Sequence, residues 1–262
     1  MLHNSQKDFL KRHIGPSEED KLKMLKKLNY KSLDDLIKNT VPEKIHFKGE
    51  LNIGDSNSEY EALRKLKAIS KKNQIYSNFI GMGYYGTYTP YVILRNILEN
   101  PGWYTSYTPY QPEVAQGRLE MLLNFQQMVV DFTGMDIANA SLLDEGTAAA
   151  EAMGLSDRLN KSDSNLVFVS ENCHPQTIEV LKTRAEPIGL KVFVGDENKV
   201  LDQLKEDIVC GILQYPGTLG DIKDPSEAIS KIHKKNGKAI LACDLLSLAK
   251  LKTPRELGAD IA

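Results

Sequence analysis

The last third of the chain alternates short apolar runs with helical patterns, and this alternation constrains the fold more than any other feature. The runs have the length of strands and lie at 165–170, 190–194, 207–214 and 238–243. Helical patterns at 175–185 and 225–235 separate them. Short, continuously apolar strands that alternate with helices are typical of a parallel sheet covered on both faces. We therefore expect an α/β fold, with residues 135–262 forming a large α/β domain.

Residues 1–72 are expected to form a helical arm. Ser17 precedes three acidic residues in the arrangement of a helix N-cap, and leucines follow at helical spacing. Further helices are predicted at 32–38 and from Ser58, the last with a stripe of Tyr60, Leu63, Leu66 and Ile69. The arm carries 16 Lys and Arg against 11 Asp and Glu, which is the composition of a solvated surface.

Residues 73–160 contain no lysine, and their only basic side chains are Arg95, Arg118 and Arg158. Lysine is the residue most easily placed on a solvated surface. Eight of the 11 tyrosines lie between residues 76 and 110. We expect residues 73–134 to form loops and helices (at 90–98 and 113–133) that contact another part of the protein or a partner. The Leu and Met stripe at 119–130 is expected to be core.

Charge and cysteine content exclude several classes of function. The chain has 33 Lys and Arg against 35 Asp and Glu, a formal net charge of −2, which gives no case for binding nucleic acid or a membrane surface. Cys173, Cys210 and Cys243 lie far apart, so neither a metal site nor a disulfide framework is expected. We interpret them as reduced, buried thiols of a cytoplasmic protein.

A glycine-rich segment, Gly81-x-Gly83-x-x-Gly86, has the letters of a dinucleotide-binding motif. That motif requires a preceding strand and a helix that opens at its third glycine, but here no helix is predicted before about residue 90. The glycines are better explained by tight turns and a close approach of the backbone.

Three features in chain order suggest a pyridoxal phosphate site. A Glu145-Gly146-Thr147 turn before an Ala-rich helix could bind phosphate, although an ordinary capped helix is an open alternative. His174 follows the first strand and could stack on the cofactor ring, or be structural. Asp244 ends the fourth strand and could pair with the pyridine nitrogen. A Schiff-base lysine is missing, because Lys250 and Lys252 follow Asp244 too closely.

Six longer motifs resemble a known family. They are FLKRHIGP at 9–16, GMGYYGT at 81–87, NPGWYT at 100–105, YTPYQPEVAQGR at 107–118, LLDEGTAAAEAM at 142–153 and CDLL at 243–246. On these residues the chain resembles the N-terminal part of the glycine cleavage system P-proteins, the decarboxylating glycine dehydrogenases. The resemblance covers essentially the whole chain.

The resemblance implies the fold type I of pyridoxal phosphate-dependent transferases, the aspartate aminotransferase type, with an incomplete large domain after the arm. The family decarboxylates glycine with pyridoxal phosphate and passes the aminomethyl group to the lipoyl arm of the H-protein. It is built from two homologous halves, fused or separate. The C-terminal half is catalytic and carries the Schiff-base lysine.

The resemblance also implies roles for individual residues. Gly146, Thr147, His174 and Asp244 would be vestigial cofactor positions of a degenerate half. The Tyr-rich loops would support the catalytic half, through Tyr84, Tyr85, Tyr107, Tyr110 and Gln111. Alone, a chain ending at Ala262 is expected to lack a catalytic residue, to be inactive, and to expose an unpaired sheet edge.

Two alternatives stay open at this stage. The chain could be a structural or regulatory paralogue that binds a catalytic half without contributing to turnover. It could also be an independent pyridoxal phosphate lyase that uses Lys250 or Lys252.

Overall fold

The computed structural model describes Phe9, residues 12–104 and residues 108–262, which form two units. The units are Met1–Ser77 and Asn78–Ala262. Within the described residues, no helix combines the length and the hydrophobicity that a membrane span requires.

The first unit is helical, as the sequence predicts. Its elements are α2 (Glu18–Lys27), α3 (Leu33–Thr40), a 3-10 turn η1 (Glu43–Ile45) and α4 (Glu59–Ser70). Ser17 and Ser58 cap α2 and α4 in reciprocal capping boxes with Asp20 and Glu61. The stripe predicted on α4 is solvent-exposed within this unit.

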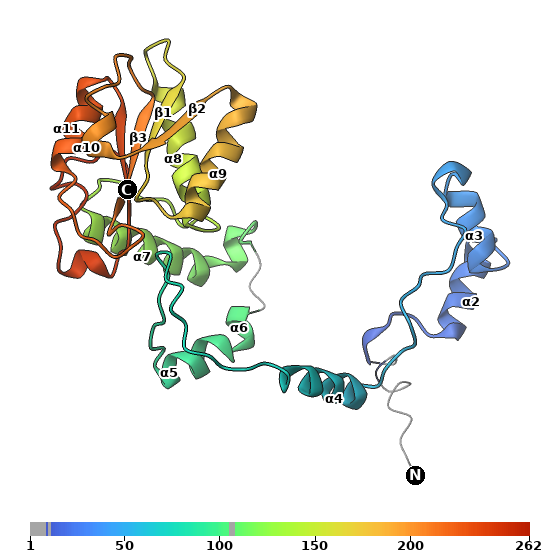
Figure 1. The fold of residues 1–262 in the computed structure, drawn as a ribbon. Coiled ribbons are helices and arrows are strands. Elements are labelled where there is room, and N and C mark those ends of the chain that lie inside the picture. The colour runs from blue at the N-terminus through green and yellow to red at the C-terminus, as the bar shows by residue number, and fades with distance from the viewer. Residues whose placement is uncertain (1–8, 10–11, 105–107) are drawn as a thin grey trace. The chain divides into compact units, whose positions relative to one another are not determined.

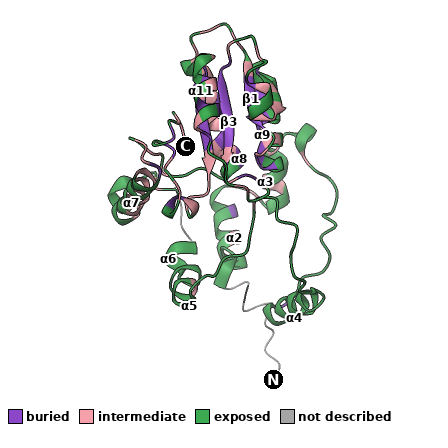
Figure 2. Ribbon diagram, turned by 60° about the vertical axis from the view of Figure 1, so that its left-hand side comes forward, coloured by how far each residue is buried: buried purple, intermediate pink, exposed green. Residues whose placement is uncertain are grey.

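Short helices and one long helix begin the second unit. They are α5 (Tyr91–Ile93), a π-helical turn η2 (Leu94–Leu98), α6 (Pro101–Tyr104), a 3-10 turn η3 (Pro112–Val114) and α7 (Gln116–Thr133). The single helix predicted at 113–133 is thus interrupted at Ala115, and the one at 90–98 changes from α to π geometry. Figure 2 shows α5 and α6 as largely exposed.

The prediction that residues 119–130 are core is wrong. None of these side chains is buried, and Leu123 is 65% exposed. The physical reason is that α7 meets the rest of its unit mainly at its C-terminal end, where the buried Thr133 accepts a backbone hydrogen bond from Arg255. Much of its apolar surface therefore has no covering element among the described residues.

A four-stranded parallel sheet forms the centre of the second unit (Figure 1), which confirms the expected fold class. Its strands are β1 (Leu166–Ser170), β2 (Lys191–Gly195), β3 (Cys210–Tyr215) and β4 (Lys238–Cys243), in the order β2-β1-β3-β4. The third strand begins at Cys210, three residues later than the apolar run predicts. Helices and turns complete the unit, namely α8 (Glu145–Leu159), α9 (Pro175–Ala185), η4 (Glu186–Ile188), α10 (Glu197–Val200), α11 (Ser226–Lys234) and η5 (Ser247–Ala249).

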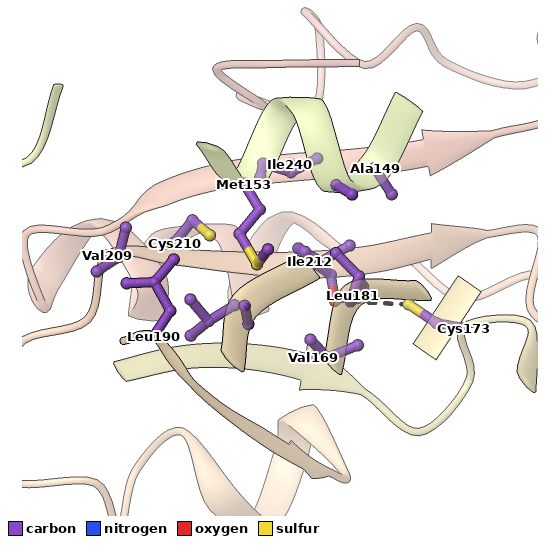
Figure 3. Close-up of a cluster of buried hydrophobic side chains, with 13 residues drawn as sticks. Ala149, Met153, Val169, Cys173, Leu181, Leu190, Val209, Cys210, Ile212 and Ile240 are labelled. Atoms are coloured by element: carbon purple, nitrogen blue, oxygen red, sulfur yellow. Dashed lines mark hydrogen bonds between the residues drawn. The ribbon is translucent and has the colours of Figure 1, made fainter. Parts of the chain in front are cut away.

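The strands carry buried apolar side chains on both faces because helices cover both faces. On one face, α8 and α9 contribute Met153 and Leu181, which lie over Val169 and Ile212 (Figure 3). On the other face, Ile232 of α11 belongs to a second cluster that is built around Phe168, Leu213 and Leu241. This two-sided burial explains the continuous apolar runs in the sequence.

The strand order creates a switch point in the sheet. After β1 the chain builds β2 at one edge, and it then returns to place β3 on the opposite side of β1. The loops that leave the carboxyl ends of β1 and β3 therefore diverge. In open α/β sheets, ligands bind in the crevice at such a point.

The three cysteines are free, and burial raises the pKa of each thiol: to about 12 for Cys173 and Cys210 and to about 11 for Cys243. Because only the thiolate reacts, we expect alkylation by iodoacetamide at pH 8 to be at least ~100-fold slower in the folded chain than in denaturant. A mass-spectrometric time course would measure both rates, and Cys243 should be the first to react. Similar rates in the two states would contradict the burial of these thiols.

Candidate functional site

A depression of about 650 Å³ lies at the carboxyl ends of β3 and β4, beside the loop that follows β1. It is lined by Gly81, Gly83, Tyr84, Tyr85, Thr87, Glu145, His174, Gln214, Pro216, Gly217, Thr218, Leu219, Gly220, Cys243, Asp244 and Leu245. Four of the residues singled out from the sequence, Tyr84, Tyr85, His174 and Asp244, therefore meet at one place. No lysine or arginine is among the described residues that line it.

Hydrogen bonds connect the loop that follows β1 to the loop that follows β3 at the switch point. The backbone N–H and the hydroxyl of Thr218 both donate to the carbonyl oxygen of Asn172, at 3.0 and 2.9 Å. The side chain of Asn172 in turn donates to Glu197, which also accepts a hydrogen bond from Ser170. These hydrogen bonds join the two loops that form one side of the depression.

His174 lies between these loops and is only 6% exposed. Its Nδ1 is 2.8 Å from the Thr218 hydroxyl. Because that hydroxyl uses its single proton on Asn172, Nδ1 must be the donor in this contact. Among the described residues, the hydrogen bond of this ring to the Thr218 hydroxyl is made through Nδ1.

The predicted phosphate turn has a different structure. Glu145, Gly146 and Thr147 form the first turn of α8 rather than a turn before it, and Asp144 is the N-cap. The Asp144 carboxylate accepts the Thr147 backbone N–H at 2.7 Å, which holds the pKa of Asp144 below its usual value. Gly146 is buried, and a Cβ there would lie 3.3 Å from Val180 of α9, so this glycine serves helix packing. The chain's own carboxylate thus caps α8 and uses one of the backbone N–H groups that the sequence suggested for an anion.

Two phenol groups reach carboxylates of the depression. Tyr84 donates its hydroxyl hydrogen to Glu145 at the start of α8, and Tyr85 donates to Asp244 at the end of β4. The second oxygen of Asp244 accepts the backbone N–H of Leu246 at 3.0 Å. The carboxylate that ends the buried strand is therefore paired on both oxygens.

The glycines make this arrangement possible. Gly81, Met82 and Gly83 all have positive φ, at 69°, 59° and 87°. A Cβ on Gly83 would overlap the imidazole ring of His174, and Tyr84 lies against the same ring with centroids 5.8 Å apart. The predicted tight turn and close backbone approach are confirmed here.

Other predicted residues do not join this site. Tyr107 lies outside the described residues. Tyr110 and Gln111 line a separate depression of about 630 Å³ at the start of α7. Lys250 and Lys252 follow η5 and are not among the lining residues, which removes the support for either as a Schiff-base lysine in this depression.

Sequence reasoning missed the roles of Glu145, Thr218 and Asn172. Glu145 stood inside the predicted phosphate turn, but nothing in the chain order paired it with a tyrosine 61 residues away. Thr218 and Asn172 become neighbours only because β3 lies next to β1. Knowledge of the strand order would have predicted that these two residues are neighbours, but a single sequence does not determine that order.

The two phenols should ionise late. Hydrogen bonding to Glu145 and partial burial raise the pKa of Tyr84 from 10.0 to about 12, and Asp244 raises that of Tyr85. Between pH 10 and 12 the unfolded chain would lose the Tyr84 proton that the folded chain keeps, so this contribution to stability is complete below pH 10 and declines towards pH 12. In a pH titration followed by phenolate absorbance, Tyr84→Phe should show one late-ionising tyrosine fewer than the unmodified chain. The same loss in Tyr88→Phe, at a fully exposed ring, would contradict this assignment.

Comparison with known proteins identifies the family. The family model described as "Glycine cleavage system P-protein" matches residues 11–262. The chain belongs to the glycine cleavage system P-protein family. It is 80% identical over 262 residues to a glycine dehydrogenase (decarboxylating) of Pelagibacter ubique, and 56% identical over 254 residues to one of Synechocystis.

The P-protein relatives are much longer than the chain. The match covers 100% of the chain but 27% of the Pelagibacter protein, and 97% of the chain but 26% of the Synechocystis protein. A solved P-protein, the glycine decarboxylase of the glycine cleavage system in inhibitor-bound form, superimposes with a TM-score of 0.83 at 29% identity. That superposition covers 95% of the chain and 56% of the solved chain.

A pyridoxal phosphate molecule does not fit this chain's own P-protein site. Asp144 accepts one of the N–H groups at the start of α8, Gly83 lies against the ring of His174, and Asp244 is paired with Tyr85. A lysine is also absent among the described lining residues. Glu145 and Asp244 are the carboxylates among the described lining residues, and no lysine or arginine balances them, whereas a phosphate favours positive charge.

Proposed function

We propose that this chain is a supporting part of a pyridoxal phosphate-dependent glycine decarboxylase, which passes the aminomethyl group of glycine to the lipoyl group of an H-protein. The observation that carries the proposal is the 80% identity to a glycine dehydrogenase (decarboxylating) over all 262 residues. The cofactor supplies the electron sink for decarboxylation when it is bound to the catalytic half. The protein is proposed to be cytoplasmic.

The role of this chain would be to complete the catalytic half, fused or separate. Tyr84 and Tyr85 stay partly exposed although both phenols are hydrogen-bonded, so their rings are available to a neighbour. Tyr110 and Gln111 line a second open depression and would contribute in the same way, as would Tyr107. Phe79, Tyr88 and Tyr91 are almost fully exposed, which supports a docking role for the lysine-free segment.

The two alternatives have less support. An independent lyase needs a lysine in the depression, and Lys250 and Lys252 are not among its lining residues. A non-catalytic paralogue has no observation in its favour beyond that same lack of a lysine. The identity with decarboxylating relatives favours the supporting role.

Reconstitution tests the proposal. The chain is mixed with the C-terminal part of the Pelagibacter relative, pyridoxal phosphate, lipoylated H-protein and carboxyl-labelled glycine, and released labelled CO₂ is counted. We expect release from the mixture and none from the chain alone. Borohydride reduction followed by peptide mapping should label a lysine of the added part only.

Two outcomes would contradict the proposal. One is a stoichiometric cofactor label on Lys250 or Lys252 of this chain. The other is full CO₂ release by the C-terminal part without this chain, which would favour the non-catalytic paralogue.

A further inference from the structure

The Tyr84–Tyr85 loop, defined here as residues 81–87, makes three contacts from three consecutive residues. Gly83 lies against the His174 ring, Tyr84 donates to Glu145, and Tyr85 donates to Asp244. The three receiving groups come from the loop after β1, the start of α8 and the end of β4. The loop is therefore held from three sides of the switch point.

Each contact falls where a pyridoxal phosphate molecule would need a protein group. A pyridine nitrogen would donate to Asp244, but the Tyr85 phenol already donates there. A cofactor ring would stack on the imidazole of His174, but the backbone of Gly83 is too close to this ring to admit even a Cβ. A phosphate would use the N–H groups that begin α8, but Asp144 already accepts one of them at 2.7 Å.

We propose that the loop takes the place of a cofactor in this chain, so that Glu145, Asp244 and His174 are positioning residues for the phenols of Tyr84 and Tyr85. The depression then holds the chain's own loop in place and is not a binding site for pyridoxal phosphate. The use of the two phenols in turnover rests on the proposed function. The position of the loop does not rest on the proposed function, because its three contacts lie within this chain.

Charge supports the exclusion of the cofactor. Asp144 and Glu145 place two carboxyl groups at the start of α8, and no lysine or arginine lines the depression among the described residues. The pKa of Asp144 is lowered by the N–H that it accepts, so this carboxylate stays charged when a phosphate approaches. A phosphate would meet like charge at the position where it needs donors.

A glycine series tests the contact with His174. Gly83→Ala drives a methyl group into the imidazole, whereas Gly81→Ala meets open space at a positive φ, and Gly86→Ala meets open space without a positive φ. The readout is the imidazole proton signal of His174 in the NMR spectrum, assigned by its loss in His174→Gln. We expect a clear shift in Gly83→Ala and none in Gly86→Ala. Gly81→Ala measures backbone strain without the clash.

The phenols are tested by a second variant that adds no bulk. Tyr84→Phe combined with Tyr85→Phe removes both donors and leaves the rings. Hydrogen–deuterium exchange of the peptide that contains residues 81–87 should become several-fold faster, while that of β1 and β3 stays unchanged. Glu145→Gln weakens the acceptor of Tyr84 and should speed the exchange of the same peptide. Glu151→Gln, at a second glutamate of α8 that pairs with Arg184 instead, is its matched control and should leave that exchange unchanged.

Pyridoxal phosphate itself is the third probe. Adding it to the unmodified chain should leave the His174 signal and the exchange of residues 144–147 unchanged. A cofactor-dependent shift of His174 would overturn the proposal, and so would unaltered loop exchange in the double phenylalanine variant. Since these measurements use the chain alone and no turnover, they can fail while reconstituted CO₂ release succeeds, and the reverse also holds.

Discussion

Replacing Phe168 with alanine is expected to lower the free energy of unfolding by about 3–5 kcal/mol. Phe168 is the central residue of β1 and is fully buried, with 0% of its surface exposed. Its ring belongs to the cluster beneath α11, which includes Ile232 and Leu241. A cavity of this size cannot collapse easily because the strands on either side of β1 are fixed by their ladders. Denaturant unfolding followed by circular dichroism would measure the change.

Phe193→Ala provides a matched control for that experiment. Phe193 is the register partner of Phe168 on the neighbouring strand β2, but it is 41% exposed at the sheet edge. We expect Phe193→Ala to lower the free energy of unfolding by about a third as much as Phe168→Ala, because part of the Phe193 side chain is already in contact with water. Equal effects of the two substitutions would show that β1 is not the centre of the core.

Replacing Gly83 with alanine is expected to reduce the turnover of the reconstituted enzyme by about 100-fold. The added methyl group would push the Tyr84–Tyr85 loop away from His174, and both phenols would then leave their carboxylate acceptors. Displacing positioned groups by about 1 Å is enough for an effect of this size. The measurement is labelled CO₂ release at saturating glycine, with circular dichroism to check that the sheet is intact.

Gly86→Ala is the control for turnover. Gly86 belongs to the same loop, has open space around it and is not among the residues with positive φ. It should leave turnover within about twofold of the unmodified chain, as expected for an exposed position away from strain. If Gly83→Ala were equally silent, the position of the loop would be irrelevant to the reaction.

The sequence predicted the elements of the sheet well. The strand at 238–243 and the helix at 175–185 have the predicted bounds, and the capped helices of the arm begin where Ser17 and Ser58 indicate. These features are local, because hydrophobic periodicity and capping residues act within a few positions of the chain. The prediction that the apolar stripe of α7 is buried in the core was wrong. Periodicity indicates that a helix has an apolar face, but it does not say whether the same chain covers that face.

Only part of the candidate site could be predicted from the sequence. His174 and Asp244 could be selected because each follows a buried strand, and all strands of a parallel sheet end on one edge. The actual partners of these residues could not be predicted. Asp244 meets a tyrosine 159 positions away, and the predicted phosphate turn proved to be capped by its own Asp144.

The sequence by itself determined the α/β alternation, the helical arm, the family and the residues that gather at the carboxyl edge of the sheet. Only the tertiary structure decided what those residues do to one another. The strand order β2-β1-β3-β4 brings Thr218 to Asn172, and the positive φ angles at 81–83 turn the loop back onto the sheet. The physical reason is that hydrogen bonds between distant segments depend on which strands are neighbours, and no local pattern in the chain encodes that choice.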